Sequence, residues 1–60
     1  MIQIGDLIVE KEYPEGGVGL VIEIDLNKDE GYRLFCNHTT WWYDSSWLRK
    51  NCKVISCASG

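Results

Sequence analysis

The pattern of hydrophobic and polar positions is strongest over residues 18–24, the longest β-branched run in the chain. Val21 and Ile22 are both apolar, which is typical of a central strand covered on both faces. Gly17 and Gly19 flank the start of the run and allow a bulge or a tight bend there. The pattern therefore predicts a central, curling strand around which the other elements are arranged.

Shorter apolar or alternating segments on both sides of this run predict four further strands. These strands are expected at residues 7–9, 32–36, 40–43 and 52–55, with Ile2 and Ile4 marking an earlier part of the first one. Polar segments rich in turn-forming residues predict loops over 10–17 and 25–31, and residues 56–60 have the composition of a frayed tail. The short segment 37–39 predicts a hairpin, so the third and fourth strands are expected to be antiparallel neighbours.

The segment over residues 44–50 has the signals of a short helical turn. Asp44 is a good N-cap residue, and Arg49 and Lys50 would lie in the last turn, where they complement the helix dipole. Its shortness predicts a single 3₁₀-like turn. Trp47 and Leu48 are expected to plug one end of the structure.

Five short strands with one helical turn before the last predict an all-β fold, a small five-stranded barrel that is partly open. Closing the sheet removes the exposed edges that a flat sheet of this size would carry. The chain has 60 residues, so it is expected to form one domain over residues 1–60, with a core at about residues 4–55. A hydrophobic content of 45% is far too high for a disordered chain.

The chain resembles the Src-homology-3-like (SH3-like) barrels over roughly residues 4–55. The residues that carry the resemblance are 5–9, 17–24, 32–35, Trp42 and 46–48. It is most similar to small uncharacterised proteins of that fold encoded by tailed phages, including phages of marine cyanobacteria. The resemblance implies a five-stranded SH3-like barrel and a phage accessory protein working in the host cytoplasm. The opening also resembles translation-associated KOW modules and the photosystem I accessory barrel subunit, but the basic loop residues of an RNA-binding module are missing.

The charge balance argues against unspecific capture of nucleic acid. The net charge is −3, and the 6 cationic residues are scattered except for Arg49, Lys50 and Lys53. No apolar run approaches the length of a membrane span and no signal peptide is recognisable, so a cytoplasmic protein without membrane association is expected.

The three cysteines are odd in number, which favours reduced thiols. A Cys52–Cys57 or Cys36–Cys52 bridge on oxidation stays open as an alternative. No Cys-x-x-Cys pair is present and the lone His38 lies in a turn, so neither a metal site nor a cofactor is predicted. The same absence of a catalytic constellation predicts a protein that is not an enzyme.

The aromatic side chains are the most informative candidates for function, because a barrel of this size cannot bury all of them. Strand alternation places Trp41 and Tyr43 on one face and Trp42 on the other, without deciding which face is inward. The predicted partner-binding residues are Tyr13, Tyr32, Trp41 and Tyr43. The expected partner is another protein or a second copy of the chain. The competing interpretation is that Trp42 and Trp47 fill the core while the other aromatics pack on its rim.

Two further hypotheses come from other classes of protein. A nucleic-acid-associated module would use Trp41, Tyr43 and Arg33 for stacking, with the cations at residues 49, 50 and 53 for phosphate. A structural component of a larger assembly would pair its edge strands with another chain.

Overall fold

The fold is an antiparallel sheet of five short strands with one helix. The computed structural model describes residues 2–56. The elements are β1 (Leu7–Glu10), η1 (Pro14–Gly16), β2 (Gly19–Ile24), β3 (Tyr32–Cys36), β4 (Thr39–Tyr43), α1 (Ser45–Asn51) and β5 (Cys52–Ser56). The five predicted strands are therefore confirmed in number and order. β5 extends through Ser56, one residue further than the sequence pattern predicts, and the rest of the predicted tail lies outside the described residues.

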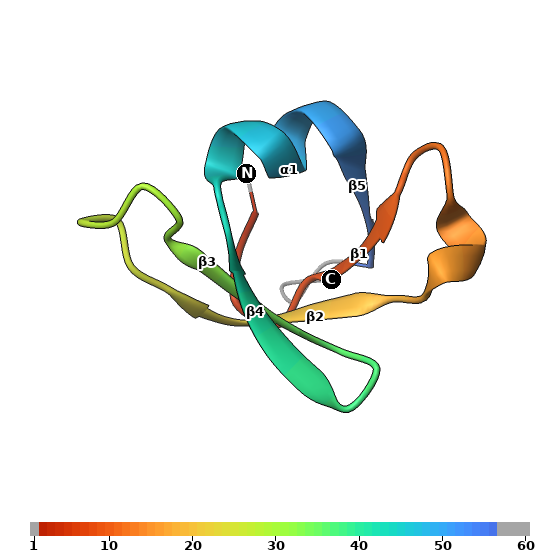
Figure 1. The fold of residues 1–60 in the computed structure, drawn as a ribbon, viewed down its shortest axis with the longest axis horizontal. Helices are drawn as coiled ribbons and strands as arrows, with labels where there is room; N and C mark the ends of the chain where they lie inside the picture. The colour runs from red at the N-terminus through yellow and green to blue at the C-terminus, as the bar shows by residue number, and fades with distance from the viewer. Residues whose placement is uncertain (1, 57–60) are drawn as a thin grey trace.

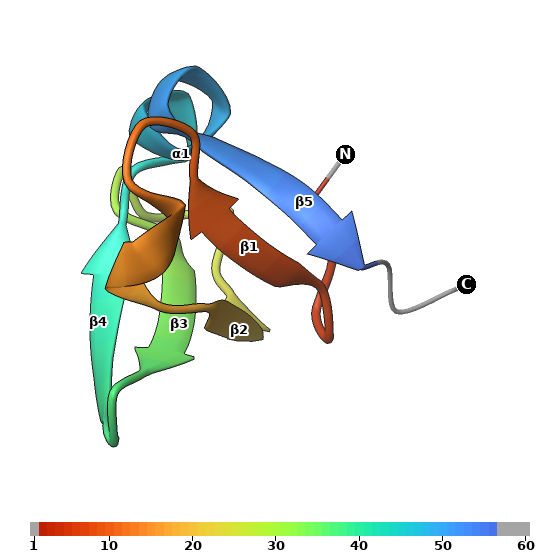
Figure 2. The same ribbon diagram turned by 90° about the vertical axis from the view of Figure 1, so that its right-hand side faces the viewer.

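The strand order in the sheet is β4-β3-β2-β1-β5, and every pairing is antiparallel. The prediction that the run over residues 18–24 forms the middle strand is confirmed, because β2 lies between β3 and β1. Figure 1 shows the sheet curving below α1, and Figure 2 shows β1 and β5 running steeply across the direction of β3 and β4. Within residues 2–56, β4 and β5 do not pair, so the sheet is curved but not closed.

The core lies on the concave side of the sheet, under α1. Ile8, Val21 and Leu34, one from each of the three inner strands, form a buried cluster with Leu48 of the helix. Burying a side chain of this size stabilises the fold by about 1.5–3 kcal/mol, so four residues on four elements hold the sheet and helix together. Leu48 therefore fulfils the predicted role of a plug.

The register of the sheet explains how the central strand curves. Val21 pairs with Leu34 and Glu23 pairs with Arg33, which leaves Ile22 as an extra residue in β2. Such a bulge bends a strand and increases its twist. The prediction that both faces of β2 are covered is wrong. Val21 is buried, but its neighbour Ile22 is 37% exposed. Gly17, with φ at +114°, supplies the tight bend before the strand, whereas the bulge lies further along.

The prediction for residues 44–50 needs a correction in helix type. α1 is a seven-residue α-helix rather than a single 3₁₀-like turn. Asp44 is its N-cap, with its carboxylate accepting a hydrogen bond from the Ser46 amide at 2.6 Å. The Leu48 amide then donates to the Asp44 carbonyl, the first bond of α-helical spacing. The helix continues because residues 47–51 contain neither glycine nor proline and α1 packs Leu48 into the core.

Two other local expectations differ from the structure. Residues 2–6 form a turn rather than an earlier part of the first strand, and the Gly5 amide donates to the Val21 carbonyl at 2.8 Å. The predicted loop 10–17 contains the 3₁₀ turn η1, where Pro14 occupies the first turn and needs no hydrogen bond from its nitrogen.

The β3–β4 hairpin has a two-residue turn, Asn37-His38. Both residues have positive φ, 54° and 66°, which is the requirement of a type I′ turn. The predicted hairpin is confirmed, and Thr39 belongs to β4 instead of the turn. The two-residue turn fixes the register of β4, and with it the side of the sheet on which each aromatic residue lies.

Candidate functional site

A hollow of about 250 Å³ opens on the concave side of the sheet. Its walls come from β1, the η1 turn, the β3–β4 hairpin and α1, so segments distant in sequence meet there. The aromatic residues that line it are Tyr13, Trp41, Tyr43 and Trp47. We call this hollow the aromatic groove.

The register of β4 places two of these aromatics. Trp41 pairs with Leu34 and Tyr43 pairs with Tyr32, so both share the concave face with the core residue Leu34. Trp41 is nevertheless 62% exposed, because β4 is an edge strand of the sheet. The structure thus decides the face that alternation left open: Trp41 and Tyr43 lie inward.

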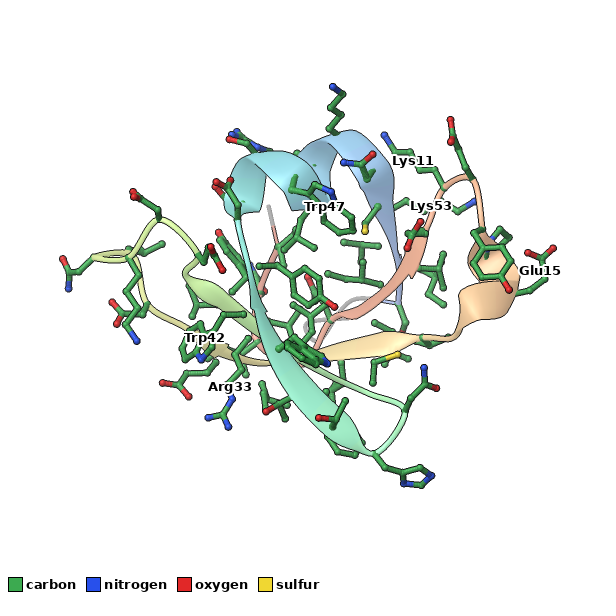
Figure 3. All side chains as sticks on the ribbon, viewed as in Figure 1. Lys11, Glu15, Arg33, Trp42, Trp47 and Lys53 are labelled. Atoms are coloured by element: carbon green, nitrogen blue, oxygen red, sulfur yellow. The ribbon has the colours of Figure 1, made fainter. Side chains whose placement is uncertain are left out.

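Trp47 forms a wall of the groove from the helix side. Its ring stacks on that of Tyr43 with centroids 5.5 Å apart and planes 27° apart. Figure 3 shows Trp47 beneath α1, directed toward the sheet. At 41% exposure it is not the buried plug that the sequence predicts, since Leu48 alone occupies that place.

Tyr13 closes the groove at the η1 end. Gly16 lies against its ring: a Cβ atom at Gly16 would come within 2.7 Å of the Tyr13 Cδ2 atom. The Gly16 amide also donates to the Tyr13 carbonyl at 3.1 Å. Glycine at this position therefore lets the ring pack on the backbone of η1 while the side chain stays 59% exposed.

The structure brings together three of the four predicted partner-binding residues and separates the fourth. Tyr32 is half-buried and lines a different hollow with Ile2, Ser45, Arg49 and Val54. Its ring packs against the core from β3. Strand parity alone could not reveal this, because Tyr32 shares the concave face and pairs directly with the groove residue Tyr43, yet it lines the other hollow.

Glu10 is the charged residue of the groove lining among the described residues. Its charge acts on two groups there. Burial raises the pKa of Tyr43 above its ordinary value of 10.0, and smaller contributions in the same direction come from the nearby Cys36, Cys52 and Glu10. Burial and Glu10 also raise the pKa of Cys52 above 9.0, while Lys11 opposes this shift. Glu10 therefore brings one negative charge to the lining of the groove.

The cysteines of the groove, Cys36 and Cys52, are free thiols. The alternative bridge from Cys52 to Cys57 lies outside the described residues. Across residues 2–56, no cluster of three or more potential metal ligands occurs. His38 is at the exposed tip of the hairpin turn.

The convex face carries Trp42, which the competing interpretation placed in the core. Lys28 Nζ lies 4.4 Å and the Arg33 guanidinium carbon 5.8 Å from the centroid of its ring. Arg33 also bonds Glu23 and Thr40, at 3.3 Å and 3.1 Å. Figure 3 shows Trp42 and Arg33 side by side, away from α1. Arg33 is thus separated by the sheet from Trp41 and Tyr43, its partners in the nucleic-acid hypothesis.

No protein family, curated protein or solved structure matches the chain. Within the described part of the chain, no helix has the length and apolar character needed to cross a bilayer.

Proposed function

We propose that the chain is a small, non-enzymatic interaction module of the SH3-like type, and that its aromatic groove binds a segment of a protein partner. The observation that carries this proposal is the convergence of four aromatic side chains from three elements around one hollow. Tyr and Trp are enriched where proteins bind one another, because each offers a large apolar surface and a polar tip at little entropic cost.

The exposure of these residues supports a binding role over a purely structural one. Trp41 and Tyr13 are both exposed, whereas the buried core cluster consists of the aliphatic residues Ile8, Val21, Leu34 and Leu48. A partner that covered Trp41 and Tyr13 would remove apolar area from water at about 25 cal/mol per Å². A hollow of this size fits a few side chains of an extended segment rather than a folded domain.

Selection of a random peptide library against the whole chain tests the proposal. We expect enriched peptides that bind the native chain and lose at least about tenfold in affinity with Trp41→Ser, which removes an interface aromatic. Leu26→Ser is the matched control, because Leu26 is 82% exposed in the turn between β2 and β3 and lies outside the groove. Circular dichroism of each variant shows whether the fold is retained.

Three results would contradict the proposal. One is a selection without enriched peptides, and another is enriched peptides that bind Trp41→Ser as well as the native chain. The third is loss of folding in Trp41→Ser, since this would show that Trp41 is a core residue. Light scattering on the free chain tests whether a second copy of the chain occupies the groove. In that case the native chain would be a dimer, and Trp41→Ser would dissociate it.

A further inference from the structure

The aromatic groove has negative charge and no cation in its lining. Glu10 is exposed on β1, and its carboxylate forms no hydrogen bond or ion pair with another residue of the range 2–56. The remaining polar lining comes from neutral residues, including Asn37 and Thr39. A ligand that enters the groove therefore meets, beside aromatic rings, a carboxylate that has no hydrogen-bond or ion-pair partner among residues 2–56.

The cation nearest to Glu10 in sequence is held elsewhere. Lys11 Nζ donates to the Arg49 carbonyl at 3.4 Å, near the C-terminal end of α1. Neither Lys11 nor Arg49 lines the groove. The negative charge of Glu10 thus stays available to a group from outside the chain.

The convex face has cation–aromatic contacts within the chain, and the aromatic groove has none among the described residues. There the ring of Trp42 has two cations of the chain within 5.8 Å of its centroid, from Lys28 and Arg33. Among the described residues, no cation lies over the rings of Trp41, Tyr43 or Trp47. The face of an aromatic ring attracts a cation, and the attraction is strongest where water is excluded.

We propose that the aromatic groove binds the cationic side chain of a lysine or arginine in the partner segment, with Glu10 as its counter-ion and Trp41, Tyr43 and Trp47 around it. This inference rests on the proposed function and names the chemistry of its ligand. The aliphatic stem of such a side chain packs on the rings while its charged end meets the carboxylate. The charge and the ring faces of the groove both select for this ligand over a neutral one.

Nuclear magnetic resonance titration of the whole chain with acetyl-Gly-Arg-Gly-amide tests the inference. The paired ligand carries citrulline, a neutral isostere of arginine, and a second pair compares lysine with Nε-acetyl-lysine. We expect each cationic peptide to bind about tenfold more tightly than its neutral partner. The indole resonances of Trp41 and Trp47 should shift, and that of Trp42 should stay in place.

Glu10→Gln should reduce the preference for the cationic peptide at least about threefold, which corresponds to the loss of one partly solvated ion pair. Glu15→Gln is the matched control, because Glu15 is an exposed carboxylate on η1 outside the groove lining. Equal binding of cationic and neutral peptides, or an unchanged preference in Glu10→Gln, would overturn the inference. If library peptides still bind at the groove in that case, the proposed function stands and only the ligand chemistry is wrong.

Discussion

Trp41 and Trp42 are neighbours in the chain and have opposite roles in the structure. Trp41 pairs with core residue Leu34 on the concave face and stays exposed, while Trp42 pairs with Arg33 on the convex face under two cations. The alternation of side chains was predictable from sequence, but its inward direction was not, because all three residues from 41 to 43 are large and aromatic.

This difference predicts opposite effects on stability. Trp41→Ser should change the free energy of unfolding by less than about 0.5 kcal/mol, as for most exposed positions. Trp42→Ser should cost at least about 1 kcal/mol, because it removes two cation–aromatic contacts and half-buried surface. Urea unfolding of both variants measures the comparison. A larger loss for Trp41→Ser would contradict the assignment of the two faces.

The raised pKa values of Cys52 and Tyr43 predict how stability depends on alkaline pH. Each group ionises in the unfolded chain near its ordinary pKa, 9.0 or 10.0, and at a higher pH in the folded chain. Above pH 9 the folded state therefore holds more protons than the unfolded state, and stability falls as pH rises. Urea unfolding between pH 7 and pH 10.5 should show a flat region followed by this decline.

Cys52→Ser and Tyr43→Phe isolate the two contributions, because neither replacement titrates in this range. Each variant should show a weaker alkaline decline than the native chain. A decline of unchanged size in both variants would show that other groups cause it.

At the scale of the element, the sequence predicted strand positions better than strand distortions. The apolar runs and turn residues located all five strands, because a half-buried strand needs such a pattern. The bulge at Ile22 was not predictable, since Ile22 continues the β-branched run and only pairing with β3 reveals the extra residue. The sequence predicted a shorter helix than the structure has. The length of the helix depends on the packing of Leu48 against the sheet, which local sequence signals do not reveal.

The N-cap of α1 gives a direct test of what starts the helix. Asp44→Ala removes the acceptor for the Ser46 amide and should cost about 0.5–2 kcal/mol. Asp44→Asn is the matched variant, because the amide oxygen of asparagine can still accept this hydrogen bond. Its loss in free energy of unfolding should therefore be much smaller. Thermal unfolding of both proteins gives the comparison. Equal losses would show that the charge of Asp44, rather than its capping bond, stabilises the helix.

The hairpin turn predicts a stabilising substitution. His38 has a φ of 66°, where an L-residue is disfavoured by roughly 1 kcal/mol relative to glycine. His38→Gly should therefore raise the free energy of unfolding by up to about 1 kcal/mol, and it creates the Asn-Gly pair that type I′ turns favour. His38→Ala is the control that removes the imidazole without relieving the backbone. An equal gain in both variants would mean that the imidazole itself is unfavourable there.

At the scale of the whole molecule, the groove depends on contacts that one segment cannot show. The sequence identified Tyr13, Trp41 and Tyr43 as candidates because too many aromatics were present for the core. It missed Trp47 and Glu10, which reach the groove only because α1 folds over the concave side and β1 pairs with β5. No sequence signal distinguished Glu10 from the other exposed carboxylates of the loop that follows it.

The most direct test of the account uses the three tryptophans as reporters of the two faces. The indole N–H resonances of the ¹⁵N-labelled chain are followed during titration with the tightest peptide selected from the library. We predict that the resonances of Trp41 and Trp47 move together with increasing peptide, while that of Trp42 stays in place. Larger shifts at Trp42 than at Trp41 and Trp47 would place binding on the convex face and contradict the account.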